Sequence, residues 1–354
     1  MSWHFLDIRH PGSQALCVLQ GNHGATFVLK RSGSGQYSLQ RLRGEGIEVF
    51  AVNLTGLPGN PVHVTGCIDK DNEMAFLVRA ETSLVLMQIT QAGNVAWRKE
   101  LVTAGSFSSA AIAIDAGTIF VGLGVQGTVA IGNSTFTDDG VAAAFTRNAG
   151  QHVWSEKLLL GIGAIAVDGH RATFCGVSSA DAITVQSISY EGQRQEACTY
   201  SMSASNLQSA IYTGSKLHLA GVTYVDDGQP LVYQIALQHS RFSEPCLTKI
   251  DTDQSLVELH ASSNVVYMYV NTDQYGSWLL LDGNPYYSFT DNFVHASPQI
   301  ALSERHGSPA MGFLKCGSLV GEFNINHKCF DIGEQADSVA YVLYIEAVNL
   351  LATC

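Results

Sequence analysis

The sequence predicts an all-β protein, a seven-bladed β-propeller with a C-terminal strand extension. Short apolar segments recur in pairs along the 354 residues, and a tight turn separates the members of each pair. The clearest copies are Ala111–Asp115 with Thr118–Gly122, and Ala164–Asp168 with Ala172–Gly176. A four-stranded unit that recurs about every 40 to 60 residues is typical of propellers, because each small sheet buries its faces only against neighbouring copies.

Aligning the pairs predicts the order of strands within each blade. First strands are expected at His4–Arg9, Val62–Ile68, Ala110–Asp115, Ala164–Asp168, Gln208–Thr213, Val257–Ser262 and Gln299–Glu304. Second strands, at a blade-sized mean spacing of about 49 residues, are expected at Ala15–Gln20, Met74–Arg79, Thr118–Leu123, Ala172–Val177, Lys216–Gly221, Val265–Val270 and Ala310–Lys315. Third strands are expected at Ala25–Lys30, Ser83–Ile89, Val141–Thr146, Ala182–Ile188, Leu231–Leu237, Ser277–Leu281 and Ser318–Asn324. Both faces of these strands are often apolar, as sheets packed between two neighbours require.

This alignment predicts one domain over residues 1–333. Its blades are expected at residues 1–45, 60–102, 106–158, 161–201, 206–250, 255–295 and 297–333, with an insertion at 46–59. The segment Ile47–Asn60 is apolar enough to form an extra strand within this insertion.

The tail, residues 334–354, is predicted to hold one further strand. Apolar residues occupy both of its faces, so an exposed edge there would invite aggregation. The strand is expected either to close the ring or to pair with a partner chain. In the second case the partner-binding residues are Tyr341, Leu343, Tyr344 and Ile345.

Two hairpins between third and fourth strands match each other, at Gln91–Trp97 and Asn148–Trp154. Their glycines suit the positive φ of a tight turn, and the tryptophans are expected to cover the outer strand against the next blade. With G-T-I-F-V-G-L-G and F-T-R-N-A-G-Q-H-V-W in residues 117–154, the chain resembles the seven-bladed, SBBP-type propeller repeats of bacteria. The resemblance implies the fold and no catalytic residues.

The composition of the chain favours some classes of binding partner and disfavours others. Charged residues make up 14%, against about 25% in typical proteins, so the surface is largely neutral and polar, which favours burial in an assembly. The formal charge of −12, without a basic cluster, disfavours nucleic acid. No signal peptide and no membrane-spanning run is evident, so we expect cytoplasmic synthesis without membrane insertion. The eight cysteines lack C-x-x-C pairs and are expected to be reduced thiols.

No motif predicts a cofactor or a metal site. Gly122–Gly127 satisfies G-x-G-x-x-G, but a strand and not a helix is expected after it, which disfavours a nucleotide. His327 and Cys329 have no third metal ligand nearby in the sequence.

Acidic loops between second and third strands are the candidate ligand site. In a propeller these loops share one face, so their carboxylates could bind Ca²⁺ or sugar hydroxyls. The alternative is that Asp-Gly simply forms good turns. The candidate residues are Asp138, Asp139, Asp181, Asp226, Asp227 and Asp273.

These observations favour a non-catalytic propeller that acts as a structural or protein-interaction component of a larger assembly, such as a virus or phage particle. The first alternative is a carbohydrate- or ligand-binding propeller that uses the acidic loops. The second is an enzyme with its site at the central channel, where the first strands end in Asp7, Asp115, Asp168 and Glu304. No G-x-S-x-G elbow, Walker A loop or paired-carboxylate motif supports the enzyme.

Overall fold

The computed structural model describes the backbone of most of residues 3–345. The ranges outside the description are 1–2, 10–12, 22–24, 44–46, 60, 62, 81–82, 102–105, 159–160, 179–181, 196, 203, 225–228, 250–254, 263–264, 273–275, 282–283, 292–298, 306–307, 320–321, 326–327, 332–335 and 346–354. Side chains are described mainly between residues 25 and 249. Strands dominate the described part, which contains no apolar helix of membrane-spanning length.

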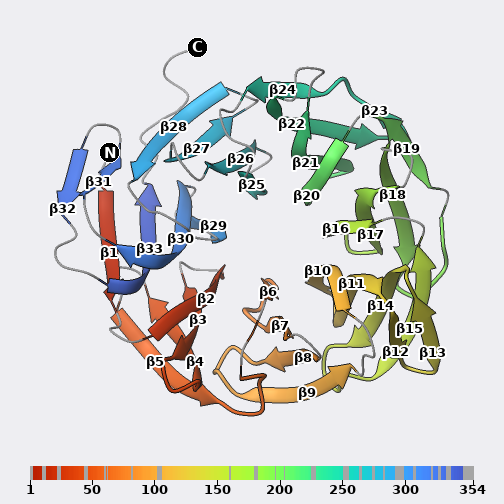
Figure 1. Cartoon of the computed structure of the whole chain (residues 1–354), viewed down its shortest axis with the longest axis horizontal. Coiled ribbons are helices and arrows are strands. Elements are labelled where there is room, and N and C mark those ends of the chain that lie inside the picture. Colours follow the sequence, from red (N-terminus) through yellow and green to blue (C-terminus); the bar gives the residue numbers. More distant parts are fainter. Residues whose placement is uncertain are drawn as a thin grey trace.

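The strands form small antiparallel sheets that stand around a central axis, so the chain is a β-propeller, as predicted (Figure 1). Seven sheets of four or more strands are present among the described residues. Each begins with an innermost strand, and the following strands are added outward toward the rim.

The first four sheets run in chain order. The first contains β2 (Ser13–Gln20), β3 (Thr26–Ser32), β4 (Tyr37–Arg43) and β5 (Ile47–Leu54), and the second contains β6 (His63–Ile68), β7 (Met74–Arg79), β8 (Leu84–Ile89) and β9 (Val95–Leu101). The third contains β10 (Ser106–Asp115), β11 (Thr118–Gln126), β14 (Gly140–Thr146) and β15 (His152–Leu158). The fourth contains β16 (Gly161–Val167), β17 (Arg171–Val177), β18 (Ala182–Ser189) and β19 (Cys198–Ser201). A separate hairpin of β12 (Thr128–Ile131) and β13 (Ser134–Thr137) interrupts the third.

The remaining sheets are larger or discontinuous in sequence. One contains β20 (Ala204–Thr213), β21 (Lys216–Tyr224), β22 (Pro230–Gln238), β23 (Arg241–Phe242) and β24 (Cys246–Lys249). The next contains β25 (Ser255–Ser262), β26 (Val265–Thr272), β27 (Gly276–Leu281), β28 (Asn284–Asp291), β31 (Glu322–Ile325) and β32 (Lys328–Asp331). The last contains β29 (Gln299–Arg305), β30 (Ser308–Leu319), β33 (Ala336–Ile345) and β1 (Trp3–Arg9).

The structure corrects the prediction at the start of the chain. The expected first strand, His4–Arg9, does not pair with β2; β1 pairs antiparallel with β33, from Trp3 opposite Ile345 to Arg9 opposite Val339. The prediction of an insertion at residues 46–59 is also wrong, because β5 pairs with β4 as the fourth strand of the first sheet. An apolar strand early in the chain looks the same whether it pairs with the next strand or with the far end.

The end of the chain differs too. The expected third strand at Ser318–Asn324 does not form: Ser318 and Leu319 end β30, and β31 pairs with β28 of the preceding sheet. Its place is taken by β33, which pairs with β30 on one side and with β1 on the other.

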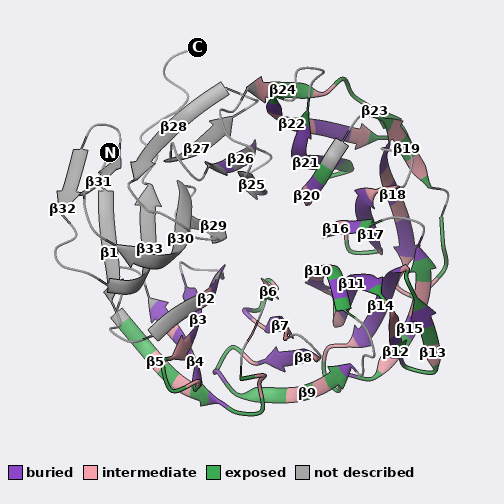
Figure 2. Cartoon of the chain, viewed as in Figure 1, coloured by how far each residue is buried: buried purple, intermediate pink, exposed green. Residues whose placement is uncertain are grey.

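The core consists of the middle strands, which are buried on both faces because each sheet is packed between two neighbours (Figure 2). All six residues of β8 are buried. The second strands of four sheets each carry a phenylalanine with 0% exposure, namely Phe27, Phe76, Phe120 and Phe174. Cys67 and Cys175 carry free thiols, and burial raises the pKa of both.

Candidate functional site

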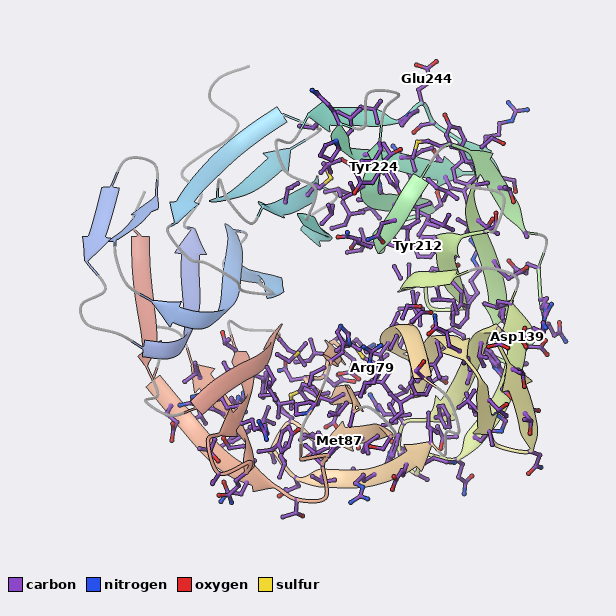
Figure 3. All side chains as sticks on the ribbon, viewed as in Figure 1. Arg79, Met87, Asp139, Tyr212, Tyr224 and Glu244 are labelled. Atoms are coloured by element: carbon purple, nitrogen blue, oxygen red, sulfur yellow. The ribbon has the colours of Figure 1, made fainter. Side chains whose placement is uncertain are left out.

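Two of the six candidate ligand-binding acids, Asp138 and Asp139, are described, and both are engaged within the chain. The Asp138 carboxylate accepts a hydrogen bond from the Gly127 amide at 2.7 Å, and Asp138 itself has a φ of 51°. Asp139 forms an ion pair with Lys157 of β15. Figure 3 shows Asp139 in the outer part of the ring, away from the axis. These contacts are those of a turn and a strand edge.

The other four acids, Asp181, Asp226, Asp227 and Asp273, lie outside the described residues, so the acidic-loop site stays a prediction. His327 is likewise outside the description. Within the described part of the chain, no group of three or more His, Cys, Asp or Glu side chains is arranged to hold a metal ion.

Asp115, one of the acids expected near the channel, joins two blades. Its carboxylate accepts a hydrogen bond from the Tyr190 hydroxyl, which belongs to the turn after β18 of the next sheet. Burial and this hydrogen bond both raise the pKa of Tyr190. Asp168 instead pairs within its own sheet, with Arg171 Nε at 2.7 Å. Of Asp7 and Glu304 only the backbone is described, in β1 and β29.

An equivalent contact joins the preceding pair of sheets, and the sequence alone did not reveal it. Asp69 follows the innermost strand β6, as Asp115 ends β10, and it forms an ion pair with Arg147 of the next sheet. The Asp69 side chain is only 7% exposed. Arg147 follows the third strand β14 just as Tyr190 follows β18. The acid at the end of a first strand therefore serves as a contact between blades at two successive interfaces.

The same two turns receive the predicted tryptophans. Trp97 Nε1 donates to the carbonyl oxygen of Arg147, and Trp154 Nε1 donates to that of Tyr190 at 2.9 Å. Each indole also lies against a turn glycine: a Cβ built on Gly150 would approach Trp97 to 2.6 Å, and one on Gly192 would approach Trp154 to 2.9 Å. Both glycines also have positive φ, so the backbone conformation and the close indole each favour glycine at this position of the turn. The equivalence expected for the two tryptophans is present.

Phe50 of β5 occupies the corresponding place in the first sheet. A Cβ on Gly93, whose φ is 86°, would approach the Phe50 ring to 2.7 Å. Phe50, Trp97 and Trp154 thus repeat one contact between an outer-strand aromatic and the hairpin of the next blade. The signal was in the sequence, because a glycine precedes each aromatic by four residues, at positions 46, 93 and 150.

Polar side chains on the innermost strands also link neighbouring sheets. The β25 amides of Val257 and Leu259 donate to Gln208 Oε1 at 2.6 Å and to Ser209 Oγ at 2.8 Å. Gln208 and Ser209 belong to β20, so they satisfy donors on the edge of the next inner strand. At this interface, polar side chains of one innermost strand therefore bind the backbone of the next.

Lys30 is a buried cation in the first sheet, with 6% exposure. Its ammonium donates to Gln40 Oε1, and Gln40 Nε2 in turn donates to Glu48 Oε2. Burial lowers the pKa of Lys30 from 10.5 to about 8, and the Glu48 charge only partly opposes this. The folded state therefore holds a poorly solvated charge below pH 8.

We expect Lys30 to make the protein more stable at alkaline pH. Because its folded pKa lies below its unfolded pKa, the penalty of the buried charge is full below pH 8 and disappears as the pH rises toward 10.5. Between pH 8 and pH 10 the wild type should gain about 2 kcal/mol of unfolding free energy relative to Lys30→Met. Urea unfolding of both proteins at each pH measures this gain, and parallel pH profiles would contradict it.

Exposed apolar side chains gather on the outer strands. Five large ones are exposed in the described part of the chain, and four of these lie on outer strands: Val49 on β5, Val95 on β9, Val153 on β15 and Leu247 on β24, with exposed fractions of 40% to 50%. In Figure 2 the outer strands β5 and β9 are mostly exposed or intermediate, whereas the middle strands β8 and β14 are buried. The candidate functional surface is the rim that these outer strands form.

The predicted partner-binding residues of the tail lie within a sheet. Tyr341, Leu343, Tyr344 and Ile345 belong to β33, whose backbone pairs with β1 along one edge and with β30 along the other. From Val339 to Tyr344 both edges of β33 are paired, so neither is open to a partner strand there.

Comparisons with known proteins support the fold. No protein-family model and no curated protein matches the chain, so the SBBP-type resemblance stays a prediction. The solved structure of BBS1N in complex with ARL6DN is similar with a TM-score of 0.57 at 11% identity, covering 98% of both chains. A prolyl endopeptidase structure gives 0.56 at 12% identity over 95% of this chain, which spans about half (51%) of that one. BamB from Moraxella catarrhalis gives 0.46 at 13% identity, covering 97% and 92%.

Proposed function

We propose that this chain is a non-catalytic propeller that acts as a protein-interaction component of a larger assembly. The observation that carries the proposal is the placement of the exposed Val49, Val95, Val153 and Leu247 on the outer strands of four sheets. Single exposed apolar residues are common on any protein, but their repetition on the outer strands of four sheets offers several apolar contact points for protein partners. A virus or phage particle is one assembly that fits.

The contacts of the described acidic side chains favour this function over catalysis or carbohydrate binding. Asp69 and Asp115 hold neighbouring blades together, and Asp138 and Asp139 are engaged in their own sheet. A catalytic or sugar-binding site requires acids whose oxygens are available to a ligand. The similar BBS1N structure was solved in complex with ARL6DN, and this supports the proposal of a protein-binding role.

Native mass tests the proposal. The tagged full chain should migrate in extracts of its source cells at an apparent mass well above that of the purified 38.0 kDa chain at matched concentration. Replacing both Val153 and Leu247 by Glu should shift it back toward the purified protein, with Thr135→Glu, an exposed position on β13, as the control. Equal masses in the extract and in the purified sample would contradict the proposal.

A further inference from the structure

Four outer strands share one local geometry. In β5, β9, β15 and β28 the pairing register shifts by one residue immediately before an aromatic residue, which is Phe50, Trp97, Trp154 and Tyr287 in turn. Such a β-bulge bends an edge strand, and its recurrence fixes an alignment among the four strands. Residues at the same distance from the aromatic are therefore structurally equivalent.

In β28 the segment beyond the bulge carries an additional strand. Residues 289–291, two to four positions after Tyr287, pair antiparallel with β31 through Phe289–Ile325, Thr290–Asn324 and Asp291–Phe323. The outer edge of a blade in this protein is thus able to accept a further strand at that position. The equivalent residues are Val52–Leu54 in β5, Lys99–Leu101 in β9 and Glu156–Leu158 in β15.

Of these three equivalents, the β5 segment alone is uncharged. Its sequence is Val-Asn-Leu, whereas β9 has Lys-Glu-Leu and β15 has Glu-Lys-Leu. Charged residues on an edge strand are a common protection against pairing with another chain. β5 is the outermost strand of its sheet (Figure 1). Asn53 on this strand is exposed.

We propose that β5 pairs antiparallel with β5 of a second copy of this chain, about a twofold axis at Asn53. This register places Asn53 opposite Asn53 of the other copy, where two amides hydrogen-bond, and Val52 opposite Leu54. The same twofold pairing would set Glu100 against Glu100 in β9, or Lys157 against Lys157 in β15, and directly opposed like charges are destabilising. Twofold contacts of this kind are also the most frequent among homo-oligomers.

The contact is short, so the dimer is weak. Three paired residues and the flanking Ala51 and Thr55 bury less than the area typical of stable complexes, and the dissociation constant should be on the order of 100 µM. The inference goes beyond the proposed function, because the assembly partner sought there is a different protein.

Sedimentation equilibrium of the purified full chain, from about 10 to 500 µM, tests this pairing. The wild type should show a concentration-dependent monomer–dimer equilibrium. Asn53→Glu and Asn53→Lys should each weaken self-association at least about tenfold, because each opposes two like charges at the axis. An equimolar mixture of the two variants should restore a heterodimer, because opposite charges then face each other.

Two controls address trivial outcomes. Asn53→Gln keeps a neutral amide and should dimerise like the wild type, and Thr135→Glu on β13 should leave the equilibrium unchanged. Glu100 of β9 occupies the place of Asn53 with its side chain 55% exposed, so the fold should accept a charge there, and melting curves check this. A wild type that stays monomeric, dimers in either charged variant alone, or a mixture that remains monomeric would each overturn the proposal.

Discussion

Truncation after Gly333 is expected to lower the melting temperature of the isolated protein by at least about 10 °C. The deletion removes β33, which pairs with β30 on one side and with β1 on the other. The last sheet would lose its third strand, and β1 would lose the strand that holds it. Because every blade is stabilised by its neighbours, an open ring also weakens the two sheets on either side of the gap. Thermal melts followed by circular dichroism measure the effect.

The matched control removes residues 1–10. This deletion takes away β1, the outermost strand of the same sheet, while β29, β30 and β33 remain paired. It should cost less than the loss of β33, although it still separates the beginning of the chain from its end. Equal effects of the two deletions would mean that the N-terminal strand alone keeps the ring closed. A tail deletion that leaves the melting temperature unchanged would show that β33 does not support the sheet.

The recurrence of strands was enough to predict the propeller, because the middle strands are continuous apolar runs. Such a run indicates a buried strand without any knowledge of distant residues. The sequence could not assign β1, because its partner residues lie more than 300 positions away. Nothing in a short apolar run specifies which of several similar edges it joins. The fourth strand β5 was different, because the sequence contains a local signal for it. The glycine at position 46 lies four residues before Phe50, the same spacing as before Trp97 and Trp154, and this would have identified β5 as a fourth strand.

In the candidate sites, too, local features could be predicted from the sequence, whereas contacts between distant residues could not. Asp-Gly turns could be located from the sequence, and Asp138 indeed binds a turn amide. The contacts between blades, such as Asp69 with Arg147, join residues that are 78 positions apart, so no local motif contains them. The exposure of the rim depends on which strand is outermost, and this follows only from the completed pairing.

Trp154→Ala is expected to cost about 3 to 5 kcal/mol of unfolding free energy, the usual loss for a large buried aromatic. The Trp154 side chain is 8% exposed and packs near Phe120 and Phe174, with ring centroids 6.3 Å away in both cases. Its indole also donates to the Tyr190 carbonyl oxygen of the next sheet. Trp97 is less completely buried, so Trp97→Ala should cost less. Urea unfolding gives both values.

Two further variants separate packing from hydrogen bonding at this interface. Trp154→Phe keeps an aromatic ring but loses the indole donor, so it should cost only about 1 to 2 kcal/mol. Gly192→Ala keeps the tryptophan but adds a methyl group 2.9 Å from its ring at a φ of 88°. Because both the contact and the backbone oppose that methyl group, it should destabilise the protein by at least about 1 kcal/mol. If Trp154→Ala and Gly192→Ala each changed stability by less than about 0.5 kcal/mol, Trp154 would be a surface anchor for a partner and not a contact between blades.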